Sequence, residues 1–228
     1  MVASFSRSNG ALVKGNLAEE LCKEILSGGL KPDERIVEAK WAAKFGVAQA
    51  SVREAINMLA QAGFVVKSPG RSARVICLSE CDVIHIYALR GAIEGLAARL
   101  AAESRRGLKV LQATMDFMRE SAAMGDRERL LDCDLQYHLE LCELSRNPFL
   151  IEHARRILVP LFAFVRVKVF ASGQSSSAWD KDLEAHQQII DLIRVGEGDL
   201  AEQYVKKAMA RFAKTAYDYW DKWEDHAG

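Results

Sequence analysis

The sequence predicts a mainly α-helical protein with two domains: a winged helix-turn-helix with a small β wing over residues 12–77, and an all-α helical bundle over residues 78–228. Residues 30–75 carry two short helical patterns followed by two short apolar strands. Beyond residue 79 no segment alternates at period two for long enough to make a sheet. The 228 residues also exceed one typical domain. We therefore expect each part to have its own core.

The helix-turn-helix is predicted from apolar spacing and one glycine. Residues 37–45 place their apolar side chains at helical spacing, and Gly46 then permits the left-handed conformation that ends a helix. A second helical pattern over residues 49–62 has its apolar side chains on one face, at Val52, Ala55, Ile56 and Leu59. Residues 47–50 leave room only for a tight turn between these helices.

The residues after Gly63 predict a β-hairpin. A strand begins at residues 64–66, residues 68–71 read Ser-Pro-Gly-Arg as in a turn, and residues 73–76 return as the second strand. In a winged helix-turn-helix the N-terminal residues of the second helix enter the major groove, and the hairpin reaches the phosphates. We therefore expect Arg53 to contact DNA; the alternative is a solvated surface arginine with a salt-bridge partner.

Residues 46–65, GVAQASVREAINMLAQAGFV, resemble the recognition-helix signature of the GntR family of bacterial transcription regulators. The sequence departs from the signature at Ala48 and Gln49, where the family usually has Ser-Arg, and at Ser51, where it usually has Pro. Because Gln prefers adenine edges, we expect an operator that differs from the family's common one. The resemblance also assigns a DNA contact to an arginine at the start of the first of these two helices, and the wing tip carries a further arginine. The predicted DNA-binding residues are Arg35, Gln49, Ser51, Arg53 and Arg71.

The charge distribution agrees with a DNA reader in the first domain. The chain has 31 basic and 31 acidic residues, but residues 1–75 hold 11 Lys and Arg against 7 Asp and Glu, leaving 20 against 24. A local basic excess is typical of a DNA-binding domain. There is no apolar run long enough to span a bilayer and no secretion signal, so we expect a cytoplasmic protein with a flexible arm over residues 1–11. The five cysteines lack CxxC spacing, so we expect small buried thiols in a reducing compartment; the alternative is redox activity at Cys77 and Cys81.

The second domain is predicted to contain six helices. Glycines and the Asn147-Pro148 pair interrupt an otherwise continuous helical pattern. The expected helices cover residues 80–104, 107–124, 126–145, 148–171, 179–195 and 199–222. Their length is sufficient for a bundle with a sizeable core.

One group of residues in this bundle is suited to bind a metal. Asp134 and His138 are four residues apart and project from the same helix face, and His186 lies on a helix whose apolar flanks orient it inward. One carboxylate and two imidazoles suit Zn, Ni or Mn. From the spacing alone, an Asp-x-x-x-His pair is more often a surface charge pair.

These residues, followed by Asn147-Pro148 and a later Glu-x-His, are similar to the C-terminal FCD ligand-binding domain of the FadR subfamily of GntR regulators. The resemblance implies that Asp134, His138 and His186 hold a divalent metal at the bottom of an effector cavity. The fourth family ligand, a histidine, is absent here, since Ala208 or Ala210 takes its place. Either water or effector completes a three-ligand metal site, or the cavity binds its effector without metal.

The resemblance also places Arg90 and Asn147 at the effector cavity. A buried guanidinium would bind a carboxylate through two hydrogen bonds. The alternative for Arg90 is an intrahelical ion pair with Glu94, one turn away, and the two roles are not exclusive. The alternative for Asn147 is to cap the next helix.

The resemblance implies a homodimeric transcription regulator, most commonly a repressor, that binds an inverted-repeat operator in double-stranded DNA. A small carboxylate effector would shift the placement of the DNA-binding domains through a joint at residues 78–82. Two alternatives are a regulator that senses the metal itself and a helical metalloenzyme with a DNA-binding head. The sequence has no nucleophile-and-base arrangement, phosphate loop or His-Glu-x-x-His motif, so we expect no enzymatic activity.

Overall fold

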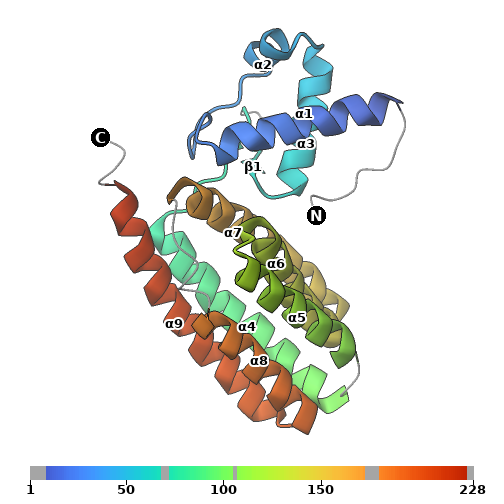
Figure 1. Cartoon of the computed structure of the whole chain (residues 1–228), viewed down its shortest axis with the longest axis vertical. Helices are drawn as coiled ribbons and strands as arrows, with labels where there is room; N and C mark the ends of the chain where they lie inside the picture. The colour runs from blue at the N-terminus through green and yellow to red at the C-terminus, as the bar shows by residue number, and fades with distance from the viewer. Residues whose placement is uncertain (1–8, 68–71, 105–106, 173–179, 225–228) are drawn as a thin grey trace. The chain divides into compact units, whose positions relative to one another are not determined.

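The structure is a computed structural model that describes residues 9–67, 72–104, 107–172 and 180–224 (Figure 1). Its described part is mainly helical with one small two-stranded sheet, as predicted. The chain divides into two compact units, of which the first contains residues 1–78 and 159–173 and the second contains the rest. The first unit therefore includes residues 159–173 from the later, helical part of the chain.

The first unit contains helices α1 (Asn9–Leu26), α2 (Glu38–Phe45) and α3 (Gln49–Gln61), followed by strands β1 (Val65–Val66) and β2 (Arg74–Val75). The two strands pair in antiparallel register. Gly46 ends α2 in the left-handed conformation, with φ of 65°, as its position in the sequence predicts. These elements form the predicted helix-turn-helix and its wing.

Helix α1 was not predicted. It packs against α3, and its Leu17, Leu21 and Ile25 side chains are buried. It begins at Asn9, so residues 9–11 of the predicted arm are helical. The three leucine and isoleucine side chains recur at four-residue spacing, which places them on one face of the helix. The remainder of the predicted arm, residues 1–8, lies outside the described residues.

The backbone of residues 34–36, just before α2, pairs with residues 73–75 of the wing. The Ile36 N–H donates to the Ala73 carbonyl at 2.8 Å, and the Val75 N–H donates to the Glu34 carbonyl at 3.0 Å. Arg35 lies in this segment and forms an antiparallel bridge with Arg74. Because this pairing keeps the backbone extended, α2 starts only at Glu38. We expected Arg35 at the start of this helix, but it lies before the helix.

The described residues of the second unit form six helices, one of which, α7, contributes only its first part. Their ends agree with the predicted ranges within two residues, because glycines and Asn147-Pro148 stand at the breaks. The helices are α4 (Glu80–Ser104), α5 (Leu108–Met124), α6 (Arg127–Leu144), α7 (Pro148–Ser172), α8 (Asp180–Val195) and α9 (Gly198–Glu224). None of the described helices is long and apolar enough to span a membrane.

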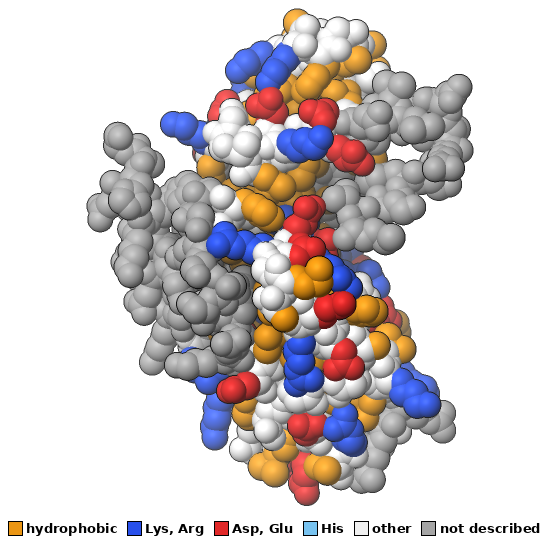
Figure 2. Space-filling view, in the orientation of Figure 1, with side chains coloured by type: hydrophobic (Ala, Val, Ile, Leu, Met, Phe, Trp, Pro, Cys, Tyr) orange, Lys and Arg blue, Asp and Glu red, His pale blue; other side chains and the backbone are white. Residues whose placement is uncertain are grey.

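Helices α4 and α9 run side by side along the second unit (Figure 1). Their close approach depends on small side chains, since a Cβ at Gly95 would stand 3.2 Å from the carbonyl oxygen of Glu202. Helix α5 packs against both α6 and α8, and α4 packs against the same two helices. On the face shown in Figure 2, side chains of both charge signs are interspersed over this unit.

Candidate functional site

Helices α6 and α8 bring three potential metal-ligand atoms together. Asp134 and His138 are one turn apart on α6, and His186 faces them from α8. The Nε2 atoms of the two histidines are 3.2 Å apart, and Asp134 Oδ1 lies 3.3 Å from His138 Nε2 and 3.2 Å from His186 Nε2. Both histidines are buried. The structure thus joins the three residues that the sequence predicted as a metal site.

The triangle of these three atoms has the dimensions of a metal coordination face. Ligand atoms about 2.1 Å from a common ion and 3.2–3.3 Å from one another subtend about 100° at that ion, between octahedral and tetrahedral values. Asp134 Oδ1 is buried and accepts no hydrogen bond from the described residues. A buried carboxylate oxygen without a donor is costly, and a cation at the centre of the triangle would remove that cost.

Each histidine is held through the ring nitrogen that points away from the triangle. His138 Nδ1 lies 2.5 Å from Glu94 Oε2, and His186 Nδ1 lies 2.5 Å from the Asp182 carbonyl oxygen. A carbonyl oxygen can only accept, so His186 must donate from Nδ1, and in its neutral form Nε2 then carries a lone pair. Carboxylate and carbonyl acceptors of this kind orient metal-binding histidines. The two imidazoles are therefore arranged to present their Nε2 lone pairs to the triangle.

Arg90 and Glu94 form a buried ion pair on α4. Arg90 Nε donates to Glu94 Oε1 at 2.6 Å, and their side chains are only 4% and 1% exposed. The guanidinium also lies over the Tyr87 ring, with 5.1 Å between Cζ and the ring centroid. The predicted ion pair is present and lies in the core. Glu94 also contacts His138, so the pair adjoins the triangle formed by Asp134, His138 and His186.

The charges around the triangle shift its titrating groups. Burial alone would raise the pKa of Glu94, but Arg90 and His138 outweigh burial and lower the pKa to about 2. Burial likewise opposes ionisation of Asp134, yet the two histidines hold its pKa below the ordinary value. For His138 burial lowers the pKa, and the Glu94 and Asp134 carboxylates more than reverse this, giving a raised pKa. Both carboxylates are thus ionised at neutral pH.

Tyr137 is a site residue that the sequence analysis missed. It is fully buried, its hydroxyl donates to the His186 carbonyl oxygen at 2.8 Å, and its ring meets the His186 ring edge-on with centroids 4.5 Å apart. It therefore ties α6 directly to the His186 turn of α8. The sequence position of Tyr137 next to His138 could have suggested that it belongs to the site. This signal is weak, because neighbouring residues on a helix point in different directions.

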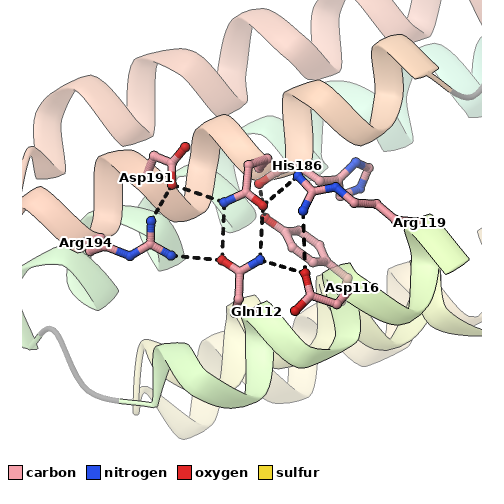
Figure 3. A network of polar contacts seen from close by, with 8 residues as sticks. Gln112, Asp116, Arg119, His186, Asp191 and Arg194 are labelled. Carbon is pink, nitrogen blue, oxygen red and sulfur yellow. Dashed lines mark hydrogen bonds and ion pairs between the residues drawn. The ribbon is translucent and has the colours of Figure 1, made fainter.

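A polar clasp joins α8 to α5 beside His186 (Figure 3). The side-chain amides of Gln112 and Gln187 donate to each other at 3.1 and 3.2 Å. Arg119 Nη2 crosses to Gln187 Oε1, and Arg194 Nη2 crosses to Gln112 Oε1, both at 2.8 Å. Each amide also donates to the aspartate four residues later on its own helix. We call this cluster the amide clasp; its members are Gln112, Asp116, Arg119, Gln187, Asp191 and Arg194.

The two halves of the amide clasp are equivalent, and the same short motif in the sequence forms each half. Both α5 and α8 carry Gln-x-x-x-Asp-x-x-Arg, at residues 112–119 and 187–194, and each residue repeats the contacts of its counterpart. In this alignment His186 occupies the buried position that Leu111 occupies on α5. The repeat was the signal that could have revealed the clasp from the sequence.

Asn147 caps α7 from the residue before it. Its Oδ1 accepts from the N–H groups of Phe149 at 3.1 Å and Leu150 at 3.2 Å. This is one of its two predicted roles. The lost fourth ligand position falls on α9, where Ala208 is buried and Ala210 is exposed; neither has a ligand atom.

The predicted DNA-contacting residues on α3 lie at its N-terminal end. Gln49 begins the helix and is exposed, Ser51 is partly exposed, and Arg53 is exposed outside the buried face that contains Val52 and Ala55. Arg35 is exposed in the segment before α2, and Arg71 lies outside the described residues. Arg53 pairs with Glu38 on α2, a residue that was not predicted from the sequence.

Comparisons with known proteins agree with both units. Residues 14–75 match the family model "Bacterial regulatory proteins, gntR family", and residues 85–211 match the model "FCD domain". A chain with this pair of domains is a transcriptional regulator with a DNA-binding head and an FCD domain. The protein belongs to the GntR family of bacterial transcription regulators, in the FadR-like subfamily with a C-terminal FCD domain.

Relatives resemble the chain over most of its length. It is 30% identical over 210 residues to "Uncharacterized HTH-type transcriptional regulator YieP" of Escherichia coli, covering 81% of this chain and 87% of the relative. It is 26% identical over 213 residues to "Probable D-xylose utilization operon transcriptional repressor" of Paenarthrobacter nicotinovorans, covering 93% and 92%. The fold is similar to the structure of E. coli McbR/YncC, with a TM-score of 0.69, 18% identity, and coverage of 91% and 98%.

Proposed function

We propose that this regulator is a homodimeric, effector-responsive repressor whose FCD domain binds a small carboxylate through a divalent metal. The observation that carries the proposal is the triangle of Asp134 Oδ1 and the two histidine Nε2 atoms, which surround a common point. When both imidazoles are neutral and protonated at Nδ1, none of these three atoms carries a hydrogen to donate to another. Zn, Ni and Mn all suit one carboxylate and two imidazoles.

The charge of the site favours an anionic effector. Asp134 offsets one of the two positive charges of a divalent ion, while the charge of Glu94 is already matched by Arg90. Three protein ligands leave coordination positions open to water or to an effector, because α9 supplies alanine at the fourth family position. A carboxylate that coordinates the metal would thus add both a ligand and a compensating charge.

Arg90 supports the same class of effector. Its guanidinium is fixed at one edge by Glu94 and stacked on Tyr87, so it can provide a rigid positive charge near the triangle. We propose that Arg90 contributes this charge to carboxylate binding. Asn147, by contrast, acts through the N-terminus of α7, which it caps.

The winged helix-turn-helix would bind an inverted repeat in double-stranded DNA, one half-site for each subunit of the dimer. The proposed contacts come from α3 and the flanking wing segments. Gln49, Ser51 and Arg53 line the exposed N-terminal part of α3, and Arg35 belongs to the segment paired with the wing. Arg71 is proposed from its position in the wing sequence alone.

The test measures metal and DNA binding by the full-length protein. Elemental analysis of the purified protein should find about one divalent ion per subunit, and Asp134→Ala and His186→Ala should lose it. Gln188→Ala, an exposed change two residues from His186, should retain it. A metal-free wild type that also fails to take up Zn, Ni or Mn in titration would overturn the metal site.

A second measurement separates an effector-responsive repressor from a metal sensor. Sequences are first selected from a random duplex DNA library, and binding to the selected duplex is then followed with and without a chelator. We expect small carboxylic acids to release DNA from the metal-loaded protein. If chelation alone changes DNA affinity and no carboxylate does, the protein senses the metal itself. Light scattering should give the mass of a dimer.

A further inference from the structure

We infer that Glu38 is a specificity-determining residue of the DNA-binding head: it holds Arg53 so that the guanidinium presents its end-on edge to a guanine in each half-site. This inference rests on the proposed contact between Arg53 and DNA. It adds that the contacted base is guanine and that Glu38 orients the Arg53 side chain.

The geometry of the pair is bidentate. Arg53 Nε lies 3.1 and 3.2 Å from the two carboxylate oxygens of Glu38, and Nη2 donates to Glu38 Oε2 at 2.7 Å. Glu38 stands in the first turn of α2 and Arg53 near the start of α3. The tight turn at Gly46 fixes these two helices against each other, so the carboxylate sits at a defined place relative to the reading helix.

The contact uses only one side of the guanidinium. Nε and Nη2 form the side-on edge, which Glu38 occupies, whereas the end-on edge consists of Nη1 and the second N–H of Nη2. Among the described residues the end-on edge has no protein acceptor. Two parallel N–H groups match O6 and N7 of guanine in the major groove, which is the commonest specific contact of arginine with a base.

The pair is exposed, and this argues for a role in orientation. The side chains of Arg53 and Glu38 are 58% and 30% exposed, so water screens their attraction and the pair adds little to folding stability. Arginine otherwise loses considerable rotamer freedom when it binds, and a guanidinium already held in place loses less. Because both groups are ionised around neutral pH, the pair persists under binding conditions.

Glu38 has an opposite effect on nonspecific binding. Its carboxylate reduces the net positive charge of the reading surface and would be repelled by DNA phosphates. Replacing Glu38 by Gln should therefore leave nonspecific affinity unchanged or raise it, while guanine discrimination falls. A residue that only stabilised the fold would lower both affinities together.

The experiment is selection from a random duplex DNA library with the full-length protein, followed by affinity measurements on the selected sequence and its single-base variants. Wild type should select a motif with a guanine in each half-site, and Arg53→Ala should lose that preference. Glu38→Gln should reduce the discrimination at this guanine at least about fivefold, the lower end of what a bidentate pair provides. Glu38→Asp, whose shorter chain keeps the charge but not the reach, should do the same.

Glu54→Gln is the matched control, because it removes an exposed carboxylate adjacent to Arg53 on the same helix. It should leave the motif unchanged. If both Glu38 variants keep the wild-type guanine preference while Arg53→Ala loses it, the inference about Glu38 is wrong and the Arg53 contact stands. If Arg53→Ala keeps the motif, the Arg53 contact fails and the inference with it. If wild type selects no motif, sequence-specific DNA binding itself is refuted.

Discussion

Glu94 and His138 are 44 residues apart in the sequence, and the Glu94 carboxylate contacts His138 Nδ1 at 2.5 Å while Arg90 holds its other oxygen. This contact places a buried, ionised carboxylate directly behind the ring nitrogen that faces Asp134 and His186. The arginine predicted as an effector ligand and the histidine predicted as a metal ligand are therefore parts of one chain of charges. If the effector binds near Arg90 as proposed, its charge would change the basicity of His138 through Glu94.

Glu94→Gln should weaken metal binding without removing a ligand. The amide cannot provide the charge that favours Nδ1 donation and increases the basicity of Nε2, so we expect metal affinity to fall roughly 10- to 100-fold. Competition with a chromophoric chelator would measure it. Glu103→Gln, an exposed change on the same helix, is the control. An unchanged affinity in Glu94→Gln would show that His138 is oriented by its other neighbours.

The sequence was sufficient to predict the helices of the second unit because the signals for them are local. The boundaries of α4 to α9 follow from helical spacing interrupted by Gly107, Gly125 and Asn147-Pro148. Asp134 and His138 could be paired because one helical turn separates them. His186 required the family resemblance, since nothing local says which helix α8 faces.

The supporting residues could not be predicted in this way. Glu94 stands among Gly and Ala on α4, and its contact with His138 depends on how two helices cross. The same holds for the pairing of Gln112 with Gln187, 75 residues apart, where a change of one residue in helix register would separate the amides. These features depend on tertiary packing.

The Arg90 and Glu94 pair should show the energetics of a buried ion pair. Arg90→Met leaves the Glu94 carboxylate with His138 as its remaining described partner, and we expect a loss of about 3 kcal/mol in the free energy of unfolding. In Arg90→Met with Glu94→Leu no buried charge of the pair remains, so most of that loss should be recovered. Urea denaturation measures both. Equal destabilisation by the single and the double variant would contradict this account.

Acid should destabilise the metal-free protein through Glu94. Its pKa is lowered from 4.5 to about 2 in the folded state, so its contribution is fully present above pH 4.5 and is lost as the pH falls toward 2. Unfolding free energies measured between these values in the presence of chelator should decline more steeply for wild type than for the double variant that combines Arg90→Met with Glu94→Leu. Parallel pH profiles would mean that other carboxylates cause the acid sensitivity.

The amide clasp should behave as one cooperative unit. Gln112→Leu leaves Gln187 and Arg194 without a shared acceptor, and Gln187→Leu has the mirror effect on Gln112 and Arg119. We expect each single change to cost about 1 kcal/mol or more in unfolding free energy, because partly buried polar groups lose partners. The double change removes both amides, so its cost should fall short of the sum by about 0.5 kcal/mol or more. Strict additivity in a double-mutant cycle, with Gln188→Leu as the exposed control on α8, would show that the two amides stabilise their helices independently.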